Sequence, residues 1–319
     1  METRNLTKEY QLKNSFGIRK KQVVHAVSGV SIKIYEGETL SLVGESGCGK
    51  STLGRMMMRL IEPTEGEIIF EGQDITACSE KQMNQVYQKI QMIFQDPYAS
   101  LNPRMKVRQL IGEPLVTHRA CIGREETDKR VKELMHMVGI RPELIDRYPH
   151  QFSGGQRQRI GIARALALNP RLIVCDEPVS ALDVSIQSQI LNLLKDLQQE
   201  FKLTYLVISH DLGVVHYISD RICVMFLGKV CEIGETEEIY KNPLHPYTKF
   251  LLQAVPSMDP EKRQKRENIL TGEIPSAVNP PSGCRFRTRC PYAKEICGER
   301  EPELKTYGDR SAACHFAGE

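Results

Sequence analysis

Residues 44–51 (GESGCGKS) constrain this chain most, because they fit the phosphate-binding pattern G-x-x-x-x-G-K-[ST]. The apolar run at residues 39–43 precedes the pattern and predicts a buried strand, and residues 52–60 predict a helix after it. A glycine-rich turn between a strand and a helix N-terminus directs several backbone N–H groups at one anion. The sequence therefore predicts an α/β protein with a nucleotide phosphate site in this turn.

Two side chains of the pattern carry the expected chemistry. Lys50 brings a flexible positive charge to the β- and γ-phosphates, and the Ser51 hydroxyl is a suitable Mg²⁺ ligand. The alternative is a chance glycine-rich turn, which the agreement of both flanks disfavours. The predicted cradle consists of Gly44, Glu45, Ser46, Gly47, Cys48, Gly49, Lys50, Ser51 and Thr52.

Acidic and amide side chains follow two further apolar runs. Residues 172–175 predict a central parallel strand that ends in Asp176 and Glu177. At the carboxyl end of such a strand, Asp176 suits a Mg²⁺ ligand acting through water, and Glu177 is placed to polarise an attacking water. Gln95 follows a short strand at residues 90–94 and could orient Mg²⁺ or that water, although a plain loop residue is the commoner interpretation.

The remaining candidates lie in a helical insert and after it. Residues 107–148 contain two amphipathic patterns that predict helices, the second closed by Gly139. The turn at residues 153–156 (SGGQ) opens another helix, a second place where backbone N–H groups could hold an anion. A later strand, residues 204–209, delivers His210 to the same sheet edge.

Composition sets the bounds. The chain has 319 residues, of which 40% are hydrophobic and 26% charged, as in ordinary globular domains. A net charge of +3 is too mild to favour nucleic acid as a partner. No apolar run approaches the ~20 residues of a membrane-spanning helix, and the N-terminus does not read as a signal peptide. We therefore expect an intracellular protein with at most peripheral membrane association.

These motifs, in this order, resemble the nucleotide-binding subunit of ABC transporters from Leu6 to about Ile239. The resemblance implies a P-loop ABC ATPase fold: a RecA-like core, an antiparallel β subdomain and a helical subdomain. It implies ATP and Mg²⁺, sandwiched head to tail between two such subunits. The residues given a role by this resemblance are Lys50 and Ser51 (own ATP), Ser153, Gly154, Gly155 and Gln156 (the partner's ATP, through the signature), Asp183 (D-loop), Glu177 (general base), His210 (γ-phosphate), Gln95 (Mg²⁺ and coupling to membrane subunits), Asp176 (Mg²⁺) and Tyr10 (adenine, with Phe16 as a rival).

The segment after the cassette resembles the oligopeptide/dipeptide importer subfamily. Residues 242–249 (NPLHPYTK) match its His-Pro-Tyr-Thr segment, in which His245 is interpreted as a packing or hydrogen-bonding residue. We expect an ATPase domain at residues 1–240, with its helical subdomain at about 103–160, and a loop-rich extension at 241–319. Between them, the basic stretch 262–266 (KRQKR) is interpreted as a solvated hinge, with a docking patch as the alternative.

Four cysteines crowd the extension with the spacing C-x5-C-x6-C-x16-C. Similar tails in some peptide-importer ATPases hold a four-iron–four-sulfur cluster, which an all-thiolate site suits. One alternative is a tetrahedral zinc site, with His315 as a spare ligand. The other is four unligated thiols, since the pattern lacks the tight C-x2-C spacing of zinc sites. The predicted ligands are Cys284, Cys290, Cys297 and Cys314.

Taken together, the resemblance predicts the ATP-hydrolysing subunit of an ABC importer for di- or oligopeptides, at the cytoplasmic face of the cell membrane. Its expected partners are a paralogous ATPase (or a second copy), two transmembrane permeases and an extracellular or periplasmic substrate-binding protein, with no nucleic acid. An importer of nickel or metal chelates is the alternative within this class. A soluble ABC-type ATPase switch without a membrane partner is the alternative outside it.

Overall fold

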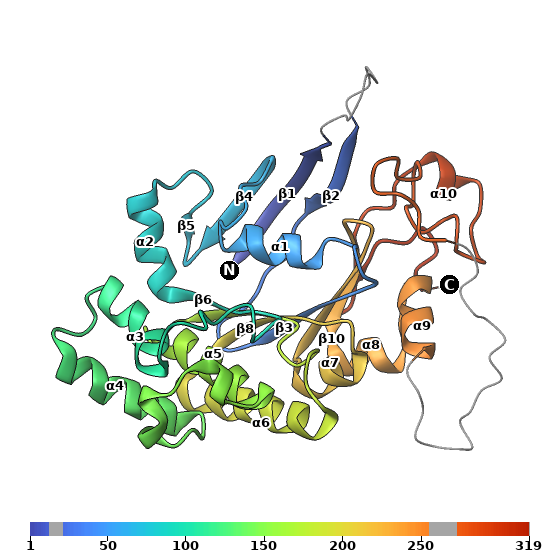
Figure 1. Cartoon of the computed structure of the whole chain (residues 1–319). Helices are drawn as coiled ribbons and strands as arrows, with labels where there is room; N and C mark the ends of the chain where they lie inside the picture. Colours follow the sequence, from blue (N-terminus) through green and yellow to red (C-terminus); the bar gives the residue numbers. More distant parts are fainter. Residues whose placement is uncertain (13–21, 255–272, 319) are drawn as a thin grey trace. The chain divides into compact units, whose positions relative to one another are not determined.

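The computed structural model describes residues 1–12, 22–254 and 273–318 (Figure 1). The chain divides into two compact units. The first unit comprises Met1–Ile34, Leu40–Ala77 and His210–Glu319, and the second comprises Tyr35–Thr39 and Cys78–Ser209. Phe16 and the basic stretch 262–266 lie outside the described residues.

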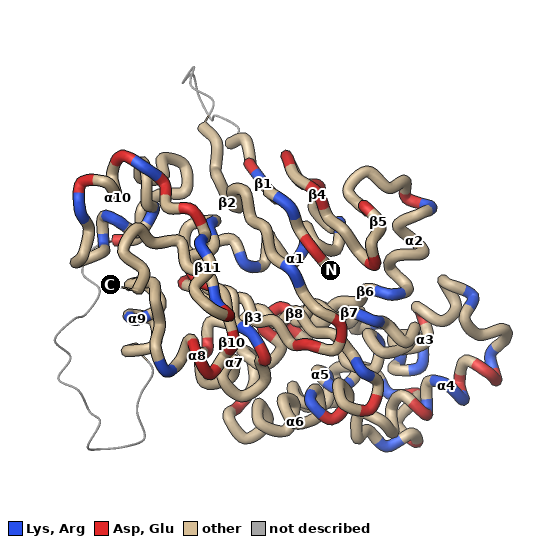
Figure 2. The backbone as a smooth tube through the Cα atoms, turned by 180° about the vertical axis from the view of Figure 1, so that it is seen from behind, with Lys and Arg blue, Asp and Glu red and all other residues tan. Residues whose placement is uncertain are grey.

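A four-stranded antiparallel sheet forms one layer of the first unit, with the order β2-β1-β4-β5. Its inner side chains, such as Leu6, Val27 and Ile68, are fully buried. Charged residues recur along β1 and β4, where Arg4 pairs with Glu2 at 2.7 Å (Figure 2). The strands are β1 (Glu2–Gln11), β2 (Val23–Val30), β4 (Glu65–Phe70) and β5 (Gln73–Asp74).

The second sheet region of this unit contains the strand that leads into the phosphate-binding turn. β3 (Thr39–Val43) is buried at every position, which explains its continuous run of mostly apolar residues. It runs parallel to β9 (Arg221–Phe226), which pairs in turn with the antiparallel β10 (Lys229–Glu235). The extension adds two short strands beyond β10: β12 (Arg310–Ala312) pairs with β10, and β11 (Lys305–Tyr307) pairs with β12.

Five helices of the first unit complete its described part. α1 begins at the phosphate-binding turn, α7 to α9 follow the sheet strands, and the four-residue α10 lies in the cysteine-containing extension. Their bounds are α1 (Lys50–Met57), α7 (Leu212–Ile218), α8 (Thr236–Lys241), α9 (Pro246–Gln253) and α10 (Ile296–Glu299).

The second unit holds three parallel strands in the order β8-β7-β6. β7 (Leu172–Asp176) and β8 (Thr204–Ile208) are buried throughout, and β6 (Ile90–Ile93) nearly so. Because the strands are parallel, Gln95 and Glu177, which follow β6 and β7, come out at the same edge.

Helices make up the rest of the second unit. α3 packs against α4 and α5, and the two helices predicted within residues 107–148 are present as α3 and α4; Gly139 (φ 72°) closes α4 as expected. The helices are α2 (Glu80–Lys89), α3 (Val107–Thr117), α4 (Arg124–Met137), α5 (Gly154–Leu166) and α6 (Val184–Phe201), with 3-10 turns η1 (Pro142–Asp146) and η2 (Pro149–Gln151).

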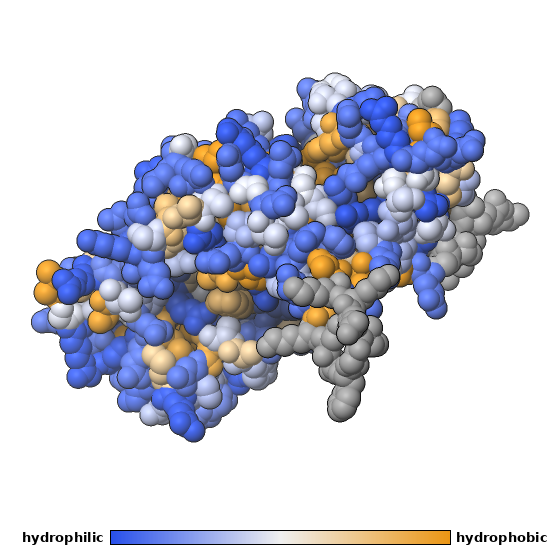
Figure 3. Space-filling model, turned by 90° about the horizontal axis from the view of Figure 1, so that it is seen from above, coloured by the Kyte–Doolittle hydropathy of each residue, from blue (hydrophilic) through white to orange (hydrophobic). Residues whose placement is uncertain are grey.

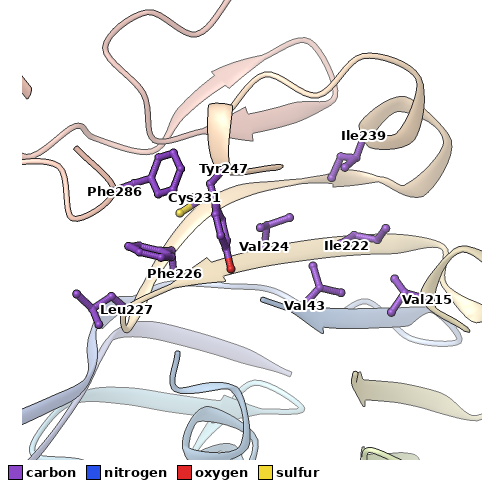
Figure 4. Packing of buried hydrophobic residues seen from close by; sticks show 10 residues of the cluster. All are labelled: Val43, Val215, Ile222, Val224, Phe226, Leu227, Cys231, Ile239, Tyr247 and Phe286. Carbon is purple, nitrogen blue, oxygen red and sulfur yellow. The ribbon is translucent and has the colours of Figure 1, made fainter. Parts of the chain in front are cut away.

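One apolar cluster joins the extension to the strand that precedes the phosphate-binding turn (Figure 4). Val43 of β3 and Phe226 of β9 belong to it, together with Tyr247 of α9 and Phe286 of the extension. The rings of Phe226 and Tyr247 lie 4.8 Å apart, and those of Phe226 and Phe286 lie 5.3 Å apart, both with edge-on geometry. The extension therefore shares its core with the phosphate-binding part of the chain.

Within the described ranges, no helix is long and apolar enough to cross a membrane. Figure 3 shows a mostly hydrophilic face, on which hydrophobic residues form small separate groups.

Candidate active site

The phosphate-binding turn has the backbone geometry that its glycines require. Gly49 adopts φ 104° as the N-cap residue of α1, and a Cβ there would lie 2.2 Å from the carbonyl oxygen of Ala26. Only glycine meets both conditions without moving the backbone. The first turn of α1 carries no acidic residue, so the helix N-terminus keeps its partial positive charge for an anion.

Lys50 lies inside the turn. It is 6% exposed, and its Nζ donates to the carbonyl oxygens of Gly44 at 2.7 Å and Glu45 at 3.0 Å. Cys48 Sγ lies 3.7 Å from the same nitrogen, and burial raises the pKa of the Cys48 thiol. The loop itself therefore holds the ammonium group.

Glu45 has two partners from the C-terminal part of the chain. Its backbone N–H donates to the Tyr247 hydroxyl at 2.9 Å. Its carboxylate accepts two hydrogen bonds from Arg289, at 2.7 and 3.1 Å. The sequence prediction missed both Tyr247 and Arg289, and no local pattern marks Arg289, which lies 244 residues away from Glu45.

In the second unit, the structure brings together two of the predicted catalytic residues. Gln95 Nε2 donates to Glu177 Oε2 at 2.7 Å. Glu177 takes a left-handed backbone conformation (φ 47°), and its N–H donates to the carbonyl oxygen of Ile208 at 2.9 Å. This turn ends β7 and places the Glu177 carboxylate beside Gln95, while Asp176 remains within the strand and only 2% exposed.

The SGGQ turn forms a complete helix cap. Ser153 Oγ accepts from the Gln156 N–H at 3.3 Å, and Gln156 Oε1 accepts from the Ser153 N–H at 3.0 Å. Gly155 is buried, and a Cβ on it would lie 2.5 Å from Cγ2 of Ile186 in α6. A Cβ on Gly154 would lie 3.4 Å from Cδ2 of Leu182, which is an ordinary contact distance. Gly155 is thus the glycine that the close packing of the α5 N-terminus needs.

The other predicted site residues occupy separate places in the two units. Tyr10 lies on β1 in the first unit, 37% exposed, with Lys8 Nζ 5.1 Å from the centre of its ring. His210 is exposed and lies two residues after the end of β8. Asp183 is exposed and is the N-cap residue of α6 in the second unit.

The four cysteines of the extension form no disulfide in the described part of the chain, and they lie in one small region. Burial, with smaller contributions from the nearby thiols of Cys297, Cys314 and Cys290, raises the pKa of the Cys284 thiol to about 11. The backbone N–H of Cys284 donates to the carbonyl oxygen of Cys297 at 2.8 Å. The four are near one another, but in the described part of the chain no three or more His, Cys, Asp or Glu side chains are grouped closely enough to hold a metal ion.

Comparison with known proteins shows to which family this chain belongs. Residues 27–180 match the family model described as ABC transporter, and residues 231–297 match the one described as oligopeptide/dipeptide transporter, C-terminal region. The oligopeptide transport ATP-binding protein AppF of Bacillus subtilis (strain 168) is 56% identical over 319 residues, covering 99% of this chain and 97% of the relative. The chain belongs to the ABC transporter ATP-binding proteins of the oligopeptide/dipeptide type.

Two further comparisons agree with this family. The oligopeptide transport ATP-binding protein OppF of Salmonella typhimurium (strain LT2) is 53% identical, with 92% of this chain and 88% of the relative covered. A solved dimeric ATP-binding cassette, in a post-hydrolysis state with ADP and Pi, is 32% identical and covers 74% of this chain and 98% of its own, with a TM-score of 0.66. The predicted P-loop ABC ATPase fold is confirmed, and the chain is an ATPase that drives transport.

Proposed function

We propose that this chain is the ATP-hydrolysing subunit of an ABC importer for di- or oligopeptides. The observation that carries the proposal is the match of residues 231–297 to the C-terminal region of oligopeptide/dipeptide transporters, added to an ABC cassette. The names of AppF and OppF, both oligopeptide transport ATP-binding proteins, support the same substrate class.

In the proposed mechanism, the P-loop and Lys50 bind the phosphates of ATP, and Tyr10 stacks on adenine. Glu177 accepts a proton from the attacking water, and the hydrogen bond from Gln95 orients the Glu177 carboxylate for that task. His210 holds the γ-phosphate. Most of the rate enhancement then comes from positioning and charge stabilisation, as is usual for phosphoryl transfer.

Mg²⁺ fits the donor set of this chain. The Ser51 hydroxyl, the Gln95 amide oxygen and the buried Asp176 carboxylate are hard oxygen donors of the kind that Mg²⁺ prefers. When bound with ATP, the ion neutralises phosphate charge. We propose these three residues as its ligands, Asp176 through water.

The partners follow from the incomplete site of a single chain. We propose that Ser153, Gly154, Gly155 and Gln156, with Asp183, contact ATP bound to a second ATPase subunit, arranged head to tail. A paralogous chain is the proposed partner. The pair would drive two membrane permeases from the cytoplasmic face, and a substrate-binding protein would deliver the substrate to the permeases. The dimeric state of the related cassette supports the pairing.

The test is the variant Glu177→Gln, which removes the general base and should trap the ATP-bound dimer. The tagged variant is expressed in its native host, the membranes are solubilised with MgATP, and the co-purifying proteins are identified. Two permeases, a second ATPase and a peptide-binding protein are the expected result. A metal-chelate-binding protein in their place would favour the alternative importer, and recovery of non-membrane partners alone would refute the transporter assignment.

We further propose that Cys284, Cys290, Cys297 and Cys314 hold a four-iron–four-sulfur cluster. The support is that the four thiols lie close enough together to affect the pKa of Cys284, in a tail that resembles those of cluster-binding peptide-importer ATPases. In the described residues the four side chains are not yet grouped as metal ligands, so binding would have to draw them together. Anaerobic purification should give broad absorbance near ~400 nm and iron with acid-labile sulfide. Stoichiometric zinc would replace this proposal by a tetrahedral site, and metal-free protein would leave four structural thiols.

A further inference from the structure

Residues from the C-terminal part of the chain contact Glu45 of the phosphate-binding loop. We propose that Arg289 and Tyr247 are positioning residues for ATP binding, acting through Glu45. The proposal rests on three contacts within the first unit, and it assigns a role in the ATPase site to residues outside the cassette motifs.

The first contact is a partly buried ion pair. Arg289 places Nη1 2.7 Å from Glu45 Oε2 and Nη2 3.1 Å from Oε1, a two-pronged geometry. The Arg289 side chain is 6% exposed and that of Glu45 is 24% exposed, so solvent screens the pair only partly. Paired guanidinium and carboxylate groups of this geometry fix orientation as well as charge. Arg289 therefore determines where the Glu45 carboxylate points, and compensates its negative charge next to a site for phosphate.

The second contact fixes the backbone of the same residue. The Tyr247 hydroxyl accepts the Glu45 N–H at 2.9 Å. The Tyr247 ring is fully buried, and it lies 4.8 Å from Phe226 and 5.3 Å from Phe286 (Figure 4). Since packing fixes the ring, the position of its hydroxyl is fixed as well. Glu45 is thus held both at its backbone and at its side chain.

The third contact links Glu45 to the phosphate-binding lysine. The carbonyl oxygens of Gly44 and Glu45 accept from Lys50 Nζ, at 2.7 and 3.0 Å. The residue that the extension holds is therefore one of the two that position the Lys50 ammonium. A shift of Glu45 would move a ligand of that ammonium and weaken phosphate binding.

The loop that carries Arg289 is itself fixed to the cassette. Phe286 is 1% exposed in the shared apolar cluster, and Arg285 donates to Ser28 Oγ at 2.9 Å and to the carbonyl oxygen of Leu227. Cys284 and Cys290 mark the two ends of this loop. Arg289, which lies within the loop, therefore links the cysteine region to Glu45 of the P-loop by direct contact.

The experiment measures MgATP affinity by calorimetry, and steady-state KM and kcat, for the full-length chain. Arg289→Gln leaves the Glu45 carboxylate unpaired, and we expect the Kd for MgATP to rise about tenfold, with kcat at saturating ATP changed by less than about twofold. Arg289→Lys keeps the positive charge but lacks the two-pronged geometry, so its Kd should lie between those of the wild type and Arg289→Gln. Tyr247→Phe removes the acceptor of one hydrogen bond and should raise Kd about threefold.

The deciding comparison is a double-mutant cycle of Glu45→Gln, Arg289→Gln and the two together. Because Arg289 acts through Glu45, Glu45→Gln should also raise the Kd, and the double variant should bind MgATP within about threefold of Arg289→Gln alone. Arg287→Gln is the matched control, because the Arg287 side chain lies in the same loop but donates to Ser282, at 2.8 and 3.2 Å, and should leave the Kd unchanged. Wild-type affinity in Arg289→Gln, or effects of the two replacements that multiply in the double variant, would overturn the proposal. Should Arg289→Gln not fold, Arg289→Lys and Tyr247→Phe with wild-type Kd would overturn it equally.

Discussion

His245 gives the most quantitative prediction, because it is a buried base whose proton would break a helix cap. It is 2% exposed, and its Nδ1 accepts from the Tyr247 N–H at 3.0 Å as the N-cap residue of α9. Burial, and secondarily the charge of Lys249, lowers the pKa of His245 to about 4. The nearby Glu232 carboxylate accepts instead from the backbone N–H groups of Leu244 and His245, at 2.9 and 3.0 Å. The imidazole is therefore neutral in the folded protein near pH 7.

The sign of the pH effect follows from the two states. The pKa of an unfolded histidine is about 6.5, so on acidification the unfolded chain takes up this proton first. Stability is then fully present above that pH and is lost as the pH falls toward 4, by about 1.4 kcal/mol per pH unit. Between about pH 7.5 and about pH 5, this one group should cost about 2 kcal/mol.

The assay is urea unfolding of the full-length chain at several pH values across this window, compared with His245→Asn. Asparagine keeps a capping acceptor but does not titrate, so carboxylates and other histidines contribute equally to both proteins. The difference between the two unfolding free energies should change by about 2 kcal/mol from the upper to the lower pH. A difference that stays constant within the error of the measurement would refute the argument that His245 is buried in the neutral form.

Three further variants test individual contacts of the structure. Gln95→Ala removes the 2.7 Å hydrogen bond to Glu177 and should lower kcat at saturating MgATP by about tenfold or more, measured by phosphate release. Gly155→Ala puts a methyl group 2.5 Å from Cγ2 of Ile186 and should cost about 1–3 kcal/mol in urea unfolding, part of which Ile186→Ala should restore. Phe286→Ala empties a site that is 1% exposed and should cost about 3–5 kcal/mol, while an unchanged unfolding midpoint would contradict the shared core.

Elements near the motifs were predictable because local pattern and burial agree there. The strand at residues 39–43 was predicted to the residue, since every position of β3 is buried and the P-loop fixes its end. α2 (Glu80–Lys89), by contrast, was missed, because only Met83 and Val86 are buried and its pattern is weak. β11 and β12, with three residues each, depend on pairing with β10, which no local signal reveals.

In the candidate site, too, the motifs were predictable from local sequence, whereas the contacts that support them were not. The sequence predicted the glycines of the turn, but the reasons lie in distant contacts, with Ala26 for Gly49 and with Ile186 for Gly155. Arg289 could not be predicted at all, because an arginine next to a cysteine has no periodicity and its partner lies 244 residues away. Motifs report on the chemistry of ATP, whereas the residues that hold the motifs in place are visible only in the folded chain.

The same contacts change what a metal in the extension would have to do. A tail this short cannot bury much surface alone, which made a metal staple attractive from the sequence. In the structure the extension instead uses the core of the cassette, with Phe286 at 1% and Ala312 at 0% exposure, and β12 paired to β10. A cluster on the four cysteines is therefore not needed to attach the extension. Its removal should leave β12 and the Phe286 packing in place and act mainly on the loop from Cys284 to Cys290, which carries Arg289 to the phosphate site.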